Sequence, residues 1–191
     1  VCLYNSTGTT LLVCTTTDVN GYYAFPGVAD GSYVVKVDPT TLPSTAYTPT
    51  YDPTAPLDNQ TPVTVSGGDV TNQNFGYQEL LGSISGTVCE GDGDGVCELG
   101  ETGLTPVTVT LIWAGPDGIL GTTDDVSTPT TTDANGNYTF TGLEPGLYQV
   151  IETNPLNYVS LADADGGNPD NITVQLGLGE NVVDQDFEDE L

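Results

Sequence analysis

The stretch TTTDANGNYTFTGLEPGLYQVIE, residues 130–152, contains two runs in which large apolar or aromatic residues alternate with smaller or polar ones. Tyr138 and Phe140 share one face of the first run, and Tyr148 and Val150 share one face of the second. A period of two is typical of β-strands that turn one face toward a core. The stretch therefore predicts two strands joined by a turn that contains Pro and Gly.

A near copy of this stretch, TTTDVNGYYAFPGVADGSYVVKV, occupies residues 15–37, which places it 115 residues earlier in the chain. Both copies contain Asp-x-Asn-Gly, at 18–21 and 133–136. This is a turn sequence, because Gly tolerates a positive φ after Asn. We therefore expect Asp18 and Asp133 to form turns rather than to bind ligands.

The similarity resumes later, where VTNQNFGYQ from Val70 matches VVDQDFEDE from Val182. Two similar units therefore follow each other, and we predict a first unit over 1–78 and a second over 79–191. The first unit is incomplete, because VCLY at its start aligns with VTLI of the second unit and no counterpart of GSISGTV precedes it. Either the chain is excised from a longer array, the alternative we favour, or a neighbouring subunit supplies the missing strand.

The fold class follows from the spacing of strands and turns. Short strands separated by Gly, Pro and Asp indicate an all-β protein in which each unit is a sandwich, and no helical period is present. The second unit holds seven candidate strands, at 82–89, 106–113, 126–132, 136–140, 146–153, 171–176 and 181–188.

Charge excludes several classes of function. The chain has 27 acidic residues against one basic residue, Lys36, and no His, which gives a net charge of −26. We therefore expect neither nucleic acid nor an anionic membrane surface as a partner. No apolar run approaches the roughly 18 residues of a membrane span, so we expect no membrane insertion. Without His, no His-dependent triad or imidazole base is available, and we predict that the protein is not an enzyme.

Several motifs together resemble a known family. GSISGTV, GETGLTPVTVTL, TTTDANGNYTFTGLEPGLYQV and VVDQDF occur in this order over residues 82–188. This arrangement resembles the B-type repeat of serine–aspartate repeat surface proteins (SdrD B-like), which is related to the B domains of collagen adhesins. The resemblance implies an immunoglobulin-like or prealbumin-like sandwich that binds Ca²⁺ and acts as a stalk. Many relatives carry a Lys–Asn isopeptide bond, but GSISGTV contains no Lys, so we predict none in the second unit.

The stretch EGDGDGVCELGE, residues 90–101, has the spacing of a twelve-residue EF-hand calcium loop, with Gly at the sixth position and Glu at the twelfth. No helical pattern flanks it, so we expect a loop between strands. The alternative is a solvated acidic turn, and the agreement in spacing favours Ca²⁺. The predicted ligands are the side chains of Glu90, Asp92, Asp94, Glu98 and Glu101 and the carbonyl oxygen of Val96.

Two further loops of the second unit gather acidic residues, and each is equally well a polar loop without an ion. In the first unit, YDPTAPLDNQ keeps Asp52 and Asp58, but Pro replaces the Gly residues, which weakens the case for a site there. The candidate ligands are Asp117, Asp124 and Asp125 in AGPDGILGTTDDV, and Asp163, Asp165, Asn168 and Asp170 in ADADGGNPDN.

The four cysteines form two close pairs. A hairpin centred on Gly8 would place Cys2 opposite Cys14 at a Cα spacing of about 4.5–5.5 Å, which suits a disulfide. A bridge between Cys89 and Cys97 would pre-fold the acidic loop. Free thiols or soft-metal binding are the alternatives, and the lack of His disfavours zinc. Paired cysteines without Met indicate an oxidising, extracellular setting.

Two functions remain after these exclusions. The leading one is a structural, calcium-stabilised module of an extracellular filament, stalk or surface layer that self-associates through strand edges. The alternative is an adhesive or carbohydrate-binding module. Its candidate aromatic residues are Tyr22, Tyr23, Tyr47 and Tyr51, and sequons that would permit glycosylation lie at Asn5, Asn59, Asn137 and Asn171.

Overall fold

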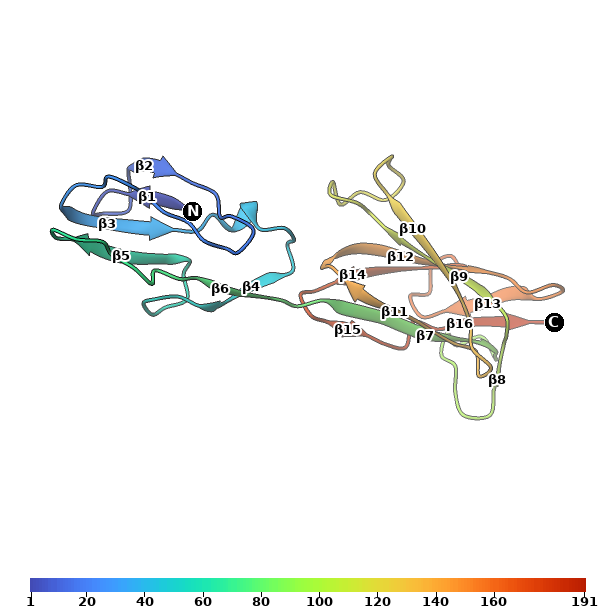
Figure 1. Cartoon of the computed structure of the whole chain (residues 1–191). Coiled ribbons are helices and arrows are strands. Elements are labelled where there is room, and N and C mark those ends of the chain that lie inside the picture. The colour runs from blue at the N-terminus through green and yellow to red at the C-terminus, as the bar shows by residue number, and fades with distance from the viewer. The chain divides into compact units, whose positions relative to one another are not determined.

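Sixteen strands and one short 3₁₀ turn make up the computed structural model, which describes residues 1–191. The contacts divide the chain into two compact units, Val1–Glu79 and Leu80–Leu191. Both units are built from strands (Figure 1). No helix has the length and apolar character needed to cross a bilayer. The all-β class is therefore confirmed.

The first unit has an antiparallel sheet in the order β2-β1-β3-β5 and a separate antiparallel pair, β4 with β6. Its buried apolar side chains include Leu3, Val35 and Ala46, whereas the apolar residues of β2 are about half exposed. The elements are β1 (Cys2–Tyr4), β2 (Leu11–Cys14), β3 (Gly31–Lys36), the 3₁₀ turn η1 (Pro39–Thr41), β4 (Tyr47–Tyr51), β5 (Gln60–Val65) and β6 (Gly76–Glu79).

The second unit is a sandwich of two four-stranded layers, in the orders β10-β9-β12-β14 and β11-β7-β16-β13. Two short strands, β8 and β15, also pair with β7. The elements are β7 (Gly82–Glu90), β8 (Thr102–Gly103), β9 (Thr108–Trp113), β10 (Val126–Thr131), β11 (Asn137–Leu143), β12 (Gly146–Thr153), β13 (Val159–Asp163), β14 (Asn171–Leu176), β15 (Asn181–Val182) and β16 (Phe187–Glu190).

The core of the second unit lies between its two layers. The alternation of the repeated stretch is confirmed, because Tyr138, Phe140, Tyr148 and Val150 are all buried and belong to one apolar cluster. Burying a side chain of this size contributes roughly 1.5–3 kcal/mol. The apolar side chains on the inward faces therefore hold the two sheets together.

The prediction of one continuous strand over 181–188 is wrong. β15 and β16 both pair in parallel with β7, but the register shifts by one residue between them, from Val182 opposite Ile84 to Phe187 opposite Val88. The intervening residues leave the ladder, and Asp184 has a positive φ of 56°. The extra residue prevents a single strand from staying in register. β8 and β13 were not predicted, because both are short and neither alternates clearly.

The internal repeat reappears as matching hydrogen bonds. The hydroxyl of Tyr138 donates to the carbonyl of Gln185, and its counterpart in the first unit, Tyr23, donates to the carbonyl of Gln73. The hydroxyl of Tyr148 also donates to a backbone carbonyl, that of Glu144, at 2.8 Å. The bonds of Tyr138 and Tyr23 fasten the repeated stretch to the irregular segment before the last strand of each unit.

We expect Tyr138→Phe to lower the free energy of unfolding of the second unit by about 1 kcal/mol, because the mutation leaves the carbonyl of Gln185 without its donor. Thermal and denaturant unfolding measure the loss. The matched control is Tyr22→Phe, since Tyr22 is 69% exposed. Equal stability of both variants and the wild type would contradict this role of the hydroxyl.

Candidate metal centre

The acidic loop is anchored at both ends by β7. The loop begins where β7 ends, and β8 returns it to the same strand, with Cys89 opposite Gly103 and Glu90 opposite Thr102. A disulfide joins Cys89 to Cys97 and closes the first half of the loop. Because both sulfurs are in this bond, neither is a thiolate ligand for a soft metal. The second disulfide joins Cys2 to Cys14, which lie opposite each other with a Cα spacing of 4.0 Å.

The loop folds around a carboxylate that sequence reasoning missed, that of Glu188 on β16. Glu188 is fully buried and accepts hydrogen bonds from the backbone N–H groups of Asp92, at 3.1 Å, and Gly95. A third, longer bond comes from the N–H of Gly93, at 3.4 Å. Bonds from backbone N–H groups to a charged acceptor are among the stronger ones in proteins. The last strand of the unit therefore supplies the group on which the loop is organised.

Three carboxylates meet at this point. Oxygen atoms of Asp92, Glu101 and Glu188 all lie within 4.8 Å of one another. At such a separation, and with an effective dielectric constant of about 20, two negative charges repel by about 3.5 kcal/mol. Ligand oxygens lie 2.3–2.6 Å from Ca²⁺, so two oxygens on opposite sides of one ion are about 5 Å apart. The spacing of this acidic cluster therefore fits a shared calcium ion.

The remaining predicted ligands lie outside this cluster of three. Asp94 uses Oδ1 to accept the N–H of Val96 at 3.0 Å, which is a local turn. Glu98 is exposed, and the charge of Asp94 is the largest of several causes that raise its pKa. Glu90 is also exposed, at the end of β7. The structure thus brings together two of the six predicted ligands, Asp92 and Glu101, and the full ligand set stays a prediction.

A second buried acid, Asp186, ties the loop to β7. Its carboxylate accepts the N–H of Thr87 at 2.8 Å through one oxygen and the N–H of Cys97 at 3.2 Å through the other. Burial raises the pKa of Asp186, and these two hydrogen bonds oppose that rise. The residue just before β16 therefore ties the middle of the acidic loop to β7.

The internal repeat contains a signal for these missed residues. Where the second unit has DQDFED, residues 184–189, the first unit has NQNFGY, residues 72–77, so neutral residues replace Asp186 and Glu188. These acids thus distinguish the end of the second unit from that of the first, which a comparison of the two units alone can reveal.

The loop between β9 and β10 uses its carboxylates to shape its own backbone. Asp117 accepts the N–H of Ile119 at 2.8 Å, and Asp125 accepts the N–H of Gly121 at 2.7 Å. Asp124 accepts the hydroxyl of Thr122 at 2.6 Å, which is the main cause of its lowered pKa. In this structure the three residues form turns, and their role as ligands stays a prediction.

The loop between β13 and β14 is similar. Asp163 accepts the N–H of Gly166 at 2.8 Å through Oδ1, while its other carboxylate oxygen is buried without a partner. Burial raises the pKa of Asp163. Asp165 accepts the N–H groups of Gly167, at 3.1 Å, and Thr173, at 2.9 Å. Calcium binding by this loop stays a prediction too.

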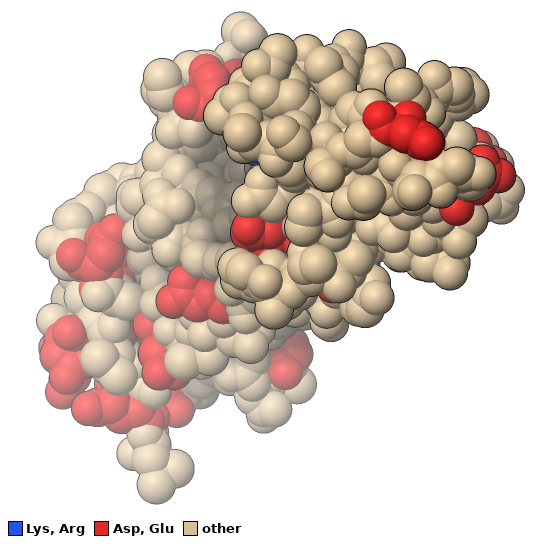
Figure 2. Space-filling view, turned by 90° about the vertical axis from the view of Figure 1, so that its left-hand side faces the viewer, with Lys and Arg blue, Asp and Glu red and all other residues tan.

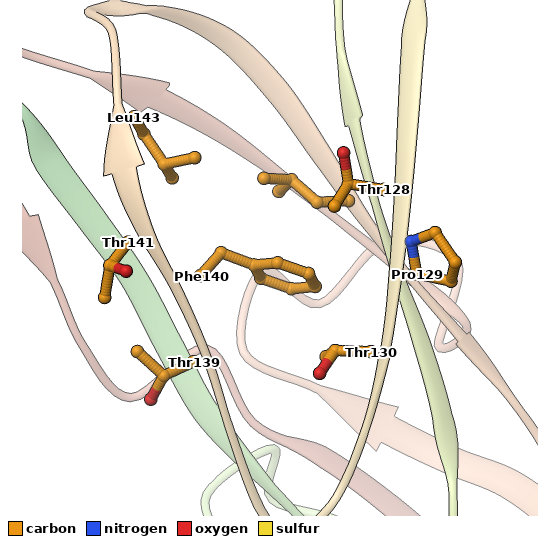
Figure 3. A pocket seen from close by; sticks show the side chains of 8 residues that line it. Thr128, Pro129, Thr130, Thr139, Phe140, Thr141 and Leu143 are labelled. Carbon is orange, nitrogen blue, oxygen red and sulfur yellow. The ribbon is translucent and has the colours of Figure 1, made fainter.

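An open groove of about 280 Å³ lies elsewhere in the second unit, between the edge strands β10 and β11. Threonines from both strands line it, and Phe140 points into it (Figure 3). Phe140 is only 6% exposed, so its ring belongs to the core rather than to a flat stacking surface. Of the tyrosines considered for an adhesive surface, Tyr22 and Tyr51 are the well-exposed ones. The groove itself is lined by threonines and apolar residues, without charged groups like those of the acidic cluster.

Comparison with known proteins settles the family. The sequence model described as the SdrD B-like domain matches residues 86–183, just over half of the chain. The chain belongs to the SdrD B-like family. The resemblance inferred from the motifs is thereby confirmed.

Curated relatives of this SdrD B-like chain are much longer proteins. It is 34% identical over 165 residues to serine-aspartate repeat-containing protein F of Staphylococcus epidermidis, which covers 83% of the chain and 9% of the relative. It is 33% identical over 147 residues to serine-aspartate repeat-containing protein E of Staphylococcus aureus, which covers 74% of the chain and 12% of the relative. The chain therefore corresponds to a small part of either relative.

Among solved structures, the chain is similar to the Bacillus anthracis TIE protein, with a TM-score of 0.44 and 16% identity over 100% of this chain and 30% of that one. It is also similar to the full-length major pilin SpaD from Corynebacterium diphtheriae. That match has a TM-score of 0.42 and 19% identity over 57% of this chain and 32% of the pilin.

The contact between Gly91 and Glu188 yields a test of the loop geometry. A Cβ atom on residue 91 would overlap Oε1 and the terminal carbon of Glu188, far inside van der Waals contact. We expect Gly91→Ala to destabilise the second unit by at least about 2 kcal/mol, because the buried carboxylate has to leave its N–H donors.

The measurement is chemical denaturation, with Gly68→Ala as the control. A Cβ atom on Gly68 would meet no atom within 4 Å. If Gly91→Ala unfolds at the same denaturant concentration as the wild type, Glu188 does not occupy this position under the loop.

Proposed function

We propose that residues 80–191 form a calcium-stabilised structural module of an extracellular surface protein. The observation that supports this most directly is the acidic cluster of Asp92, Glu101 and Glu188, whose oxygens lie within 4.8 Å of one another. No Lys or Arg occurs anywhere in residues 80–191. A cation from solution is therefore the natural counter-charge for this cluster.

The donor set suits calcium better than other divalent metals. All three groups of the acidic cluster offer hard oxygen atoms, whereas the cysteine sulfurs are in a disulfide and the chain has no His. Calcium accepts six to eight oxygens in a flexible arrangement, which an irregular loop can provide. Asp94, Glu98 and the carbonyl of Val96 remain the proposed further ligands from the same loop. The millimolar calcium of extracellular fluids makes a modest affinity, with a Kd of about 10⁻⁴–10⁻³ M, sufficient.

A bound ion would connect parts of the unit that are distant in sequence. Asp92 and Glu101 belong to the loop after β7, and Glu188 belongs to β16, the last strand. The ion would add its own bonds to the hydrogen bonds that already join these segments, and it would remove the repulsion among the three carboxylates. Binding free energy would then appear as stability of the folded unit, as it does in other small metal-dependent domains.

A structural role at the cell surface agrees with the family and the composition. The relatives named above are serine-aspartate repeat-containing proteins, and this chain repeats one kind of module twice. Acidic side chains are spread over the surface with uncharged atoms between them, as the face in Figure 2 shows. Such a surface stays hydrated, and a single basic residue leaves little for trypsin-like proteases to cleave. We extend the proposal to an array or stalk built by repetition and by self-association of strand edges.

Calcium removal is the primary test. We expect the melting temperature of the second unit to fall by about 10 °C when calcium at 100 times its Kd is replaced by EGTA, because binding at that excess is worth about 2.7 kcal/mol. Calorimetry on the full chain, with and without EGTA, gives the shift.

The ligand variant Glu101→Gln should lose most of this calcium-dependent shift, whereas Glu190→Gln, an equal change of charge at an exposed position, should keep it. Melting curves of the wild type that superimpose with and without EGTA would refute calcium stabilisation.

The disulfide of the loop gives a second test. We expect Cys89→Ala/Cys97→Ala to bind calcium several-fold more weakly than the wild type, because the open loop must lose more conformational entropy when it closes around the ion. Isothermal titration calorimetry measures the affinity, and Cys2→Ala/Cys14→Ala serves as the control in the other unit. Equal affinities for both double variants would show that the bridge does not pre-organise the loop.

A further inference from the structure

The sheets β2-β1-β3-β5 and β10-β9-β12-β14 are counterparts in the two units, and each has two free edges. The strands at these edges are β2 and β5 in the first unit and β10 and β14 in the second (Figure 1). A free edge presents unpaired N–H and C=O groups, which can pair with a strand of another chain. Proteins commonly block such pairing with Pro, with a charged side chain or with a covering segment. A free edge that lacks all of these features is a site for pairing with another chain.

Three of the four edges carry such a feature. In β14, the N–H of Thr173 donates to the carboxylate of Asp165 at 2.9 Å, so this edge position is already occupied. In β5, the ladder places Pro62 at the position equivalent to Thr173, and Pro has no N–H to donate. β10 contains Pro129, which lacks the N–H group as well. Pro or an acid therefore opposes pairing at each of these edges.

The fourth edge strand, β2, differs at the position where β10 has Pro129. Cys14 aligns with Pro129, because both directly precede the three threonines of the repeat. The N–H of Thr15 donates to the carbonyl of Val1 at 2.8 Å, so these two residues form a hydrogen-bonded pair. Such pairs alternate with non-bonded pairs along an antiparallel ladder, and Cys2 with Cys14 is the next pair. The N–H and C=O of Cys14 therefore point away from β1, toward the free edge.

The side chains of β2 are apolar and about half exposed. Leu11, Leu12 and Val13 have exposed fractions of 52%, 51% and 47%. Leu12 has no partner on β1, because a β-bulge makes it the extra residue between two paired ones. In β10 the residues aligned with Leu12 and Val13 are Ser127 and Thr128, which are polar. The first unit thus presents apolar side chains beside free backbone groups, a combination typical of strands that pair with other chains.

The absence of acids at this edge permits contact between two copies of the chain. Each copy carries a net charge of −26, so most of its surface repels another copy. Residues 1–17, which include β1 and β2, contain no Asp or Glu and form the longest such run in the sequence. β3 contains none either, and it places Lys36, the one basic side chain, opposite Cys2. Two copies would therefore meet here with the least repulsion.

We propose that β2 pairs edge to edge with β2 of a second copy of the chain. The two strands would run antiparallel about a two-fold axis, so that two four-stranded sheets become one continuous sheet. The main-chain groups of Cys14 would gain partners, and Leu12 of each copy would lie beside Val13 of the other. This inference rests on the self-association through strand edges proposed above, and it names the edge. It does not depend on calcium, because the acidic cluster belongs to the second unit.

Sedimentation velocity on the full chain, in EGTA and in CaCl₂, measures the association. We expect a monomer–dimer equilibrium in both solutions, and more dimer as NaCl is added, because salt screens the repulsion between the acidic chains. Leu12→Glu and Leu12→Lys should both be monomers at concentrations where the wild type is a dimer, because a charge of either sign is costly to bury between paired strands. The matched controls Ser127→Glu and Ser127→Lys place the same charges at the aligned position of β10, and they should dimerise as the wild type does.

Amide hydrogen exchange on the wild type tests the contact without a substitution. The N–H of Cys14 should exchange more slowly in concentrated than in dilute solution, whereas that of Ser127 should exchange equally in both. The proposal is refuted if the wild type stays monomeric up to about 1 mM, if Leu12→Lys dimerises like the wild type, or if exchange at Cys14 does not depend on concentration. A dimer that persists in EGTA, in a chain whose melting temperature does not respond to calcium, would support the edge contact although calcium stabilisation had failed.

Discussion

Residues 80–191 contain 20 carboxylates and neither Lys nor Arg, so no carboxylate in this unit can be neutralised by a salt bridge within it. The one basic side chain of the protein, Lys36, lies in the first unit, over the ring of Tyr4. Only hydration, backbone N–H groups, neutral side-chain donors, protons and cations from solution remain as partners for the acids. The positions of the acids, and the loops they shape, follow from this constraint.

The acids of this unit differ in how they are compensated, according to how deeply they are buried. Exposed acids such as Asp133 stay in water and use their oxygens for turns, as shown by its bonds to the N–H groups of Asn135 at 2.8 Å and Asn137 at 3.0 Å. Buried Glu188 and Asp186 receive backbone N–H groups from the acidic loop, so the loop and the last strand depend on each other. The Glu152 carboxylate accepts no hydrogen bond, and burial is the main cause that raises its pKa to about 8.

The sequence was informative wherever a feature depended on neighbours along the chain. Alternation in the repeated stretch located four core residues, and the spacing of Cys2 and Cys14 around Gly8 predicted residues that pair directly in the hairpin. Glu188 was missed because its role depends on β16 lying beside β7, a parallel contact between strands about 100 residues apart. Local spacing identifies the ligands that a loop contributes itself, but it gives no information about an acid that another strand brings beneath that loop.

The two units act as a natural comparison, because they share an architecture and differ in charge. Both keep the tyrosine that binds the segment before the last strand, so this bond serves the fold itself. At the last strand, the second unit carries the buried acids Glu188 and Asp189 where the first unit carries Gly76 and Tyr77. Burying these acids costs stability unless hydrogen bonds or cations compensate for it, and the proposed calcium ion would add to the compensation that backbone N–H groups already give Glu188. In the proposed function, the ion would not select the topology, which the first unit also has, but would offset the charges that the second unit carries on that topology.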